Sequence, residues 1–157
     1  MLIQFQDNLT FENIYLWANF GILPFWLMLV LIPKSKITHF FTNSVFLPLV
    51  LLSSYVYVAY QAILLDQPLL DIFKLYLSLD DLYTIFATES LLVIFWLHFL
   101  TLSIFLGTWI SKDSIKYNLP RGLVMITLVL VYFTGPLGLV LYWFIRIFSA
   151  KKLGFHD

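Results

Sequence analysis

Four long apolar stretches, separated by short polar segments, dominate the pattern of the sequence. Each is long enough to cross a bilayer, because a transmembrane helix needs roughly 20 apolar residues. Backbone polar groups in hydrocarbon must be satisfied within their own segment, so the pattern predicts helices. The expected spans are residues 12–33, 39–65, 90–110 and 122–147.

The stretch between the second and third spans, residues 67–88, is too polar for a fifth span. It mixes apolar residues with three aspartates and a lysine, which is typical of a helical segment at the membrane interface. Ser78 and Asp81 have the spacing of a capping box, which predicts a helix start there. The expected fold is therefore all-α: a polytopic integral membrane protein with four transmembrane helices, an interfacial segment and a single domain over residues 1–157.

Composition supports a membrane protein and excludes several other classes. The chain is 61% hydrophobic and 11% charged, far from the balance of a soluble domain. Its formal net charge is zero and it has no basic run, so we expect no nucleic-acid partner. It contains no cysteine, which excludes disulfides and thiolate chemistry.

The charges between the spans indicate an orientation. Four spans would place five basic residues on one side and four on the other. The first side carries Lys34, Lys36, Lys112, Lys116 and Arg121, and the second carries Lys74, Arg146, Lys151 and Lys152. With the acidic N-terminus, this favours both termini facing away from the cytoplasm. The expected location is a multi-pass position in a bacterial inner membrane or a plastid-type membrane.

Three of the expected spans carry a proline near their middle, at Pro24, Pro48 and Pro136. A proline inside a helix removes a hydrogen bond and bends the helix, so the bundle could enclose a pocket. The alternative is that neighbouring helices simply tolerate these prolines. Trp26 and Trp96 lie deep in their spans, where they could line a slot for a long apolar ligand.

His98 is the one ionisable side chain near the middle of an expected span, which makes it the candidate catalytic residue. Thr101 and Phe105 share its helix face and are expected, with Trp26 and Trp96, to contact the substrate. Any polar partner must come from another helix, and Asn19 is the candidate. The alternative is a histidine that only joins two helices by a hydrogen bond.

A protein-bound iron is difficult to build from this sequence. Non-haem oxygenases hold iron with two histidines and a carboxylate. The ligands available here are His98 and His39 with an acidic residue. Iron is therefore expected only if the reaction is an oxidative cleavage.

Several motifs together resemble one known family. In chain order they are Leu23-Pro24-Phe25-Trp26, Trp96-Leu97-His98, Phe105-Leu106-Gly107-Thr108-Trp109 and Gly135-Pro136-Leu137-Gly138. They resemble the abscisic-acid-deficient-four-like family, whose plant members are needed for neoxanthin formation in plastid membranes. The resemblance covers nearly the whole chain. Two positions depart from the family pattern, with Ser103 in place of an acidic residue and Thr108 in place of a basic one.

The resemblance implies a membrane-embedded enzyme that modifies a carotenoid or a related isoprenoid. Two reactions fit: a rearrangement of the end group, as in neoxanthin formation, or an oxidative cleavage to an apocarotenoid such as retinal. Ser103 argues against neoxanthin chemistry itself, because opening an epoxide needs an acid. The alternative is a non-enzymatic carotenoid-binding or scaffold subunit. The expected partners are the lipid bilayer, a carotenoid or other long polyene lipid and, as an open alternative, a second copy of the chain.

Overall fold

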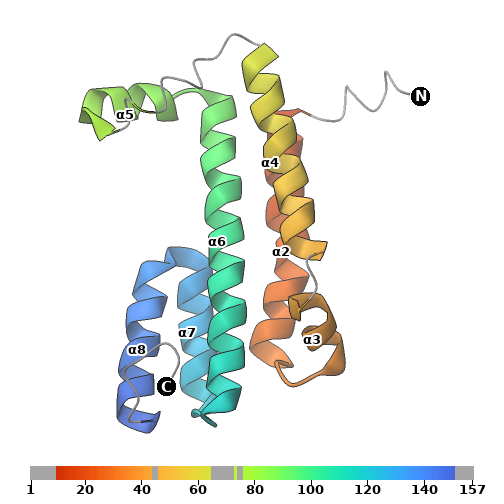
Figure 1. The fold of residues 1–157 in the computed structure, drawn as a ribbon, viewed down its shortest axis with the longest axis vertical. Helices are drawn as coiled ribbons and strands as arrows, with labels where there is room; N and C mark the ends of the chain where they lie inside the picture. The colour runs from red at the N-terminus through yellow and green to blue at the C-terminus, as the bar shows by residue number, and fades with distance from the viewer. Residues whose placement is uncertain (1–9, 44–45, 65–72, 74–75, 151–157) are drawn as a thin grey trace. The chain divides into compact units, whose positions relative to one another are not determined.

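The computed structural model describes residues 10–43, 46–64, 73 and 76–150. Among these residues the longer regular elements are all α-helices, shown in Figure 1. They are α2 (Phe11–Leu31), α3 (Lys36–Asn43), α4 (Phe46–Leu64), α5 (Leu79–Phe86), α6 (Glu89–Lys116), α7 (Arg121–Thr134) and α8 (Pro136–Ala150). The described part of the chain contains no strand, so the all-α prediction is confirmed for it.

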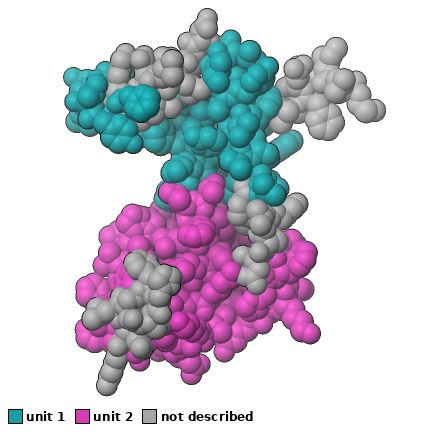
Figure 2. All heavy atoms as spheres, in the orientation of Figure 1, with its two compact units in different colours: residues 1–20, 46–100 teal, residues 21–45, 101–157 magenta. Residues whose placement is uncertain are grey.

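The chain divides into two compact units, coloured separately in Figure 2. Unit 1 comprises residues 1–20 and 46–100, and unit 2 comprises residues 21–45 and 101–157. The first part of α2 and the first part of α6 belong to unit 1, and the remainder of each helix belongs to unit 2.

Two helices, α2 and α6, are long and apolar enough to cross a membrane. Large apolar side chains face outward along these helices and along α7, including Phe20 (67% exposed), Phe105 (71%) and Phe133 (70%). Such a surface is unfavourable in water and suits contact with lipid. The structure therefore supports an association with the membrane, while the prediction of four spans is not confirmed.

The helix start predicted at Ser78 in unit 1 is confirmed. Oγ of Ser78 accepts a hydrogen bond from the backbone N–H of Asp81 at 3.0 Å, and α5 begins at the next residue. Helix α5 buries Ile85 but leaves Leu79 and Tyr83 exposed, as an interfacial helix would. Most of the expected interfacial segment before Tyr76 lies outside the described residues.

The interval expected to form the second span, residues 39–65, contains parts of two helices. Helix α3 ends at Asn43 and α4 begins at Phe46, with residues 44–45 outside the described part. Pro48 is the third described residue of α4, and the bend expected there depends on residues 44–45, so it stays a prediction.

The interval expected to form the fourth span, residues 122–147, is a hairpin of two helices in unit 2. Gly135 separates them with φ 58° and ψ −84°, and Pro136 is the first residue of α8. A proline fits the first turn of a helix but not its interior, so the Gly135-Pro136 pair ends one helix and starts the next. A helix of 14 residues, such as α7, is about 21 Å long, which is too short to cross the hydrocarbon core. Helix α8 returns to the end of unit 2 where α7 begins, as Figure 1 shows.

Candidate functional site

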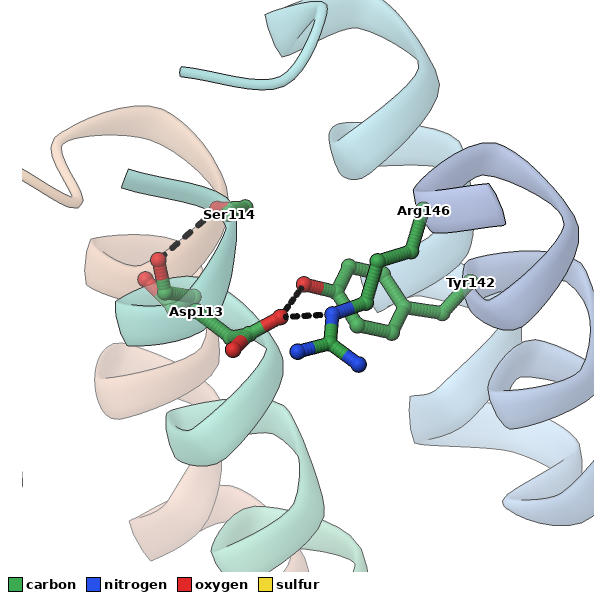
Figure 3. A network of polar contacts seen from close by, with 5 residues as sticks. Asp113, Ser114, Tyr142 and Arg146 are labelled. Atoms are coloured by element: carbon green, nitrogen blue, oxygen red, sulfur yellow. Dashed lines mark hydrogen bonds and ion pairs between the residues drawn. The ribbon is translucent and has the colours of Figure 1, made fainter. Parts of the chain in front are cut away.

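Two side chains of unit 2 converge on one carboxylate oxygen, Oδ2 of Asp113 (Figure 3). Nε of Arg146 forms an ion pair with this oxygen at 2.9 Å. The hydroxyl of Tyr142 donates a hydrogen bond to the same oxygen. Arg146 and Tyr142 are fully buried, and the Asp113 side chain is only 8% exposed. We call these three residues the Asp113 cluster.

Helical spacing explains how the Asp113 cluster forms. Asp113 lies in the last turn of α6, while Tyr142 and Arg146 are four residues apart on one face of α8. Gly138 lies one turn before Tyr142 on the same face and packs against the neighbouring helix. A Cβ at Gly138 would lie 2.5 Å from the backbone nitrogen of Val131, so α7 and α8 approach closely only because residue 138 is glycine.

Three aromatic side chains, Trp109, Tyr117 and Trp143, surround the Asp113 cluster. The Trp109 ring meets the Tyr142 ring edge to face, with a centroid distance of 5.5 Å. Cζ of Arg146 lies 4.9 Å from the Tyr117 centroid and 5.1 Å from the Trp143 centroid, which are cation–π distances. All three aromatic residues are partly exposed. This aromatic rim gives a lipid-soluble molecule a flat surface beside buried polar groups.

Charges beside Tyr117 change its acidity. The residue follows the end of α6, and Nζ of Lys116 lies 4.8 Å from its ring centroid. The cationic side chain of Lys116, and secondarily that of Arg146, lowers the pKa of Tyr117 below its ordinary value, although desolvation opposes the shift. The rim therefore contains a phenol that ionises more readily than an isolated tyrosine.

Unit 2 also contains a cavity of about 610 Å³ where α2 ends and α7 begins. Its wall is mainly apolar, and Lys34, Ser35, Asn118 and Arg121 contribute the polar part. Ser114, the neighbour of Asp113, lines the cavity, but the residues of the Asp113 cluster do not. The cavity and the cluster are therefore separate features of the same end of unit 2.

Two residues expected at the site, Asn19 and Trp96, meet in unit 1. Nε1 of Trp96 donates to Oδ1 of Asn19 at 3.1 Å, and Nδ2 of Asn19 donates to the carbonyl of Tyr15 at 2.7 Å. His98 is two residues beyond Trp96, about 200° around the helix, and its side chain is exposed. The structure therefore pairs Asn19 with Trp96 in place of His98.

Three residues expected to contact the substrate, Trp26, Thr101 and Phe105, lie in unit 2 in different environments. Trp26 is 4% exposed and packs against Gly107 and the Tyr132 ring, while Phe105 is 71% exposed. Thr101 is partly exposed. None of the three lines the cavity of unit 2. Trp26 thus packs inside unit 2, and contact of these three residues with a substrate stays a prediction.

The two histidines considered as iron ligands both have exposed side chains, with His39 in unit 2 and His98 in unit 1. Among the described residues, no three His, Asp or Glu side chains come together in a group that could hold a metal ion. The described residues therefore do not supply the ligand set that iron would need.

The Asp113 cluster was missed by the sequence analysis, which placed Asp113 and Arg146 at opposite membrane boundaries. A single helix over residues 122–147 requires that separation, and the hairpin removes it. The available signal was the four-residue spacing of Tyr142 and Arg146 after the Gly135-Pro136 break. A buried arginine on α8 then requires a nearby acid.

The described elements are all helices, two of them are apolar enough to cross a bilayer, and large apolar side chains face outward. These features define the class of membrane-associated helical proteins. The family model described as ABA DEFICIENT 4-like matches residues 13–142. This match spans most of the chain, which therefore belongs to the ABA DEFICIENT 4-like family. Comparisons with curated proteins and with solved structures gave no match. The resemblance inferred from the sequence motifs is confirmed, and the family connects the chain with carotenoids.

Proposed function

We propose that the protein takes a carotenoid or a related isoprenoid from the bilayer and rearranges its end group at the Asp113 cluster. The observation that carries this proposal is the shared contact of Tyr142 and Arg146 with one oxygen of Asp113. Membership of the ABA DEFICIENT 4-like family supports the substrate class. The cluster supplies a phenol, a carboxylate and a guanidinium, which respectively can donate a proton, accept a proton and hold the carboxylate in place at the end group of an otherwise apolar substrate.

The residue types of the cluster suit an acid–base isomerisation. Conversion of an epoxide to an allenic alcohol breaks a carbon–oxygen bond, adds a proton to the oxygen and removes a proton from a vinylic carbon. The phenol of Tyr142 can deliver the proton that Ser103 is not suited to supply, and the carboxylate of Asp113 can accept one. Arg146 holds that carboxylate in place. The reaction has no net oxidation and consumes no further reactant, so one protein can complete it.

The aromatic rim would hold the substrate beside these groups. Trp109, Tyr117 and Trp143 are each partly exposed, so a polyene can lie against their rings without entering the core of unit 2. Only the end group would then need to reach the Asp113 cluster. This arrangement also suits delivery of the substrate from the surrounding lipid.

Two alternative functions compete with this proposal. Complete burial of Arg146, which joins α8 to α6, favours a structural role for the cluster in a carotenoid-binding or scaffold protein without enzymatic activity. Oxidative cleavage to an apocarotenoid such as retinal is the second alternative, with His98 as its proposed catalytic residue and iron as its cofactor. The described residues place no iron ligands together, which favours the acid–base reaction.

Expression in a bacterial host that accumulates carotenoids, including epoxides, tests the proposal through chromatography of the pigments. We expect an isomeric product that disappears in Tyr142→Phe and Asp113→Asn and persists in Lys112→Gln, a matched change of an exposed neighbour. Each variant must be present in the membrane fraction at the level of the unmodified chain. An unchanged pigment pool would favour the non-enzymatic alternative. A shortened product that is lost in His98→Ala would favour cleavage.

A further inference from the structure

The cavity of about 610 Å³ in unit 2 takes no part in the reaction proposed above. Its volume is in the range of small-molecule binding sites, which span about 300–1,000 Å³. Its wall is formed by apolar side chains from the end of α2 and from α7, including Leu29, Val124 and Leu128. A surface of this kind suits a hydrocarbon chain.

The polar part of the cavity carries positive charge. Lys34 and Arg121 both line it and both have exposed side chains, and its lining contains no acidic residue. The nearest acid along the chain, Asp113, is engaged by Arg146 and Tyr142. The guanidinium of Arg121 also donates a hydrogen bond to the carbonyl of Leu31, which holds this charge at the end of α2.

The start of α7 adds further attraction for an anion. This helix of 14 residues begins at Arg121, and the preceding residue, Pro120, provides no side-chain cap. The first N–H groups of a helix have no acceptor within the helix, and the helix dipole favours negative charge at this end. The uncapped helix start and the two basic side chains therefore adjoin the same cavity.

We propose that this cavity binds one anionic phospholipid. The phosphate lies between Lys34, Arg121 and the start of α7, and an acyl chain lies along the apolar wall. The combination of a cationic mouth and an apolar wall favours a lipid over a soluble phosphate, which would leave that wall without a partner. The position at the end of α2, a helix long enough to cross the bilayer, is where lipid head groups are found.

The test measures binding of phosphatidylglycerol to the full chain in a neutral detergent, by native mass spectrometry and by the rise in thermal stability. Phosphatidylcholine with the same acyl chains and inorganic phosphate are the comparison ligands. We expect Lys34→Gln to weaken phosphatidylglycerol binding about fivefold, the effect of removing one basic residue near a lipid phosphate. Lys36→Gln, which changes an exposed lysine that does not line the cavity, should leave binding unchanged.

A second variant, Met125→Trp, tests the apolar wall without changing charge. Met125 lines the cavity, and a larger side chain there should displace the acyl chain and weaken binding in a protein whose lipid-free stability is retained. Equal losses in Lys34→Gln and Lys36→Gln would overturn the proposal, since they would indicate only diffuse attraction. Equal protection by phosphatidylcholine, or by inorganic phosphate alone, would overturn it as well.

Discussion

The indole of Trp26 lies directly against Gly107, so that a Cβ at residue 107 would be 2.6 Å from Cη2 of the ring. Both residues belong to unit 2, where Trp26 also packs edge to face on Tyr132. The contact explains why a small residue occupies this position of α6. It also shows that Trp26 stabilises the helix packing of the unit.

Gly107→Ala is expected to lower the free energy of unfolding by about 1–3 kcal/mol, because the added methyl group forces the buried indole to move. Thermal or denaturant unfolding in detergent measures the change. Gly21→Ala is the matched control, since nothing lies within 4 Å of a Cβ at that helical position. It should stabilise by about 0.5–1 kcal/mol through its effect on backbone entropy. Equal effects of the two substitutions would show that the Trp26 contact is not formed.

Gly138→Ala should be more damaging than Gly107→Ala. Its Cβ would lie 2.5 Å from the backbone nitrogen of Val131, and a backbone atom cannot turn aside as a side chain can. We expect α7 and α8 to separate, which would expose Trp143 and the Asp113 cluster to solvent or detergent. Tryptophan fluorescence and limited proteolysis report this opening. A hairpin as resistant to protease as the unmodified one would contradict the close approach.

Removal of one partner of the Asp113–Arg146 pair should cost about 3–5 kcal/mol, since it leaves a buried charge without its counterion. The double variant Asp113→Leu with Arg146→Met removes both charges and should cost less than the sum of the two single changes. A double-mutant cycle on unfolding free energies measures this coupling, expected at about 0.5–3 kcal/mol. Strictly additive losses would mean that the two side chains do not interact.

Tyr117 should ionise at a lower pH than an isolated tyrosine. Because Lys116, and then Arg146, lower its pKa in the folded protein, the tyrosinate form is favoured by folding. The associated stability is present above the unfolded pKa and is lost as the pH falls through the folded pKa. The absorbance difference between the unmodified chain and Tyr117→Phe isolates this titration. Lys116→Gln should move it to higher pH, and Lys112→Gln, one turn away, should not.

Local signals predicted the helices and the family better than they predicted the path of the chain. The Ser78 cap depends on residues three positions apart, so sequence alone was sufficient to place it. The motifs around Trp96, Gly107 and Gly135 likewise identified the family. These features are independent of tertiary structure.

The errors came from counting each long apolar stretch as one membrane-spanning helix. Residues 122–147 are apolar enough for a span, but Gly135 adopts a positive φ and Pro136 starts a new helix. Once the segment is read as one helix, Asp113 and Arg146 fall on opposite sides and their pairing cannot be foreseen. The catalytic role predicted for His98 is not among these errors and stays a prediction; its side chain is exposed on α6.

The return of α8 towards the start of α7 changes the sidedness of the end of α8. A single helix over residues 122–147 would place Gly122 and Ala150 on opposite faces of the bilayer. The hairpin of α7 and α8 instead puts those two residues on the same face. The chain has no cysteine, so single cysteines introduced at the two positions and labelled from outside intact cells would distinguish these topologies.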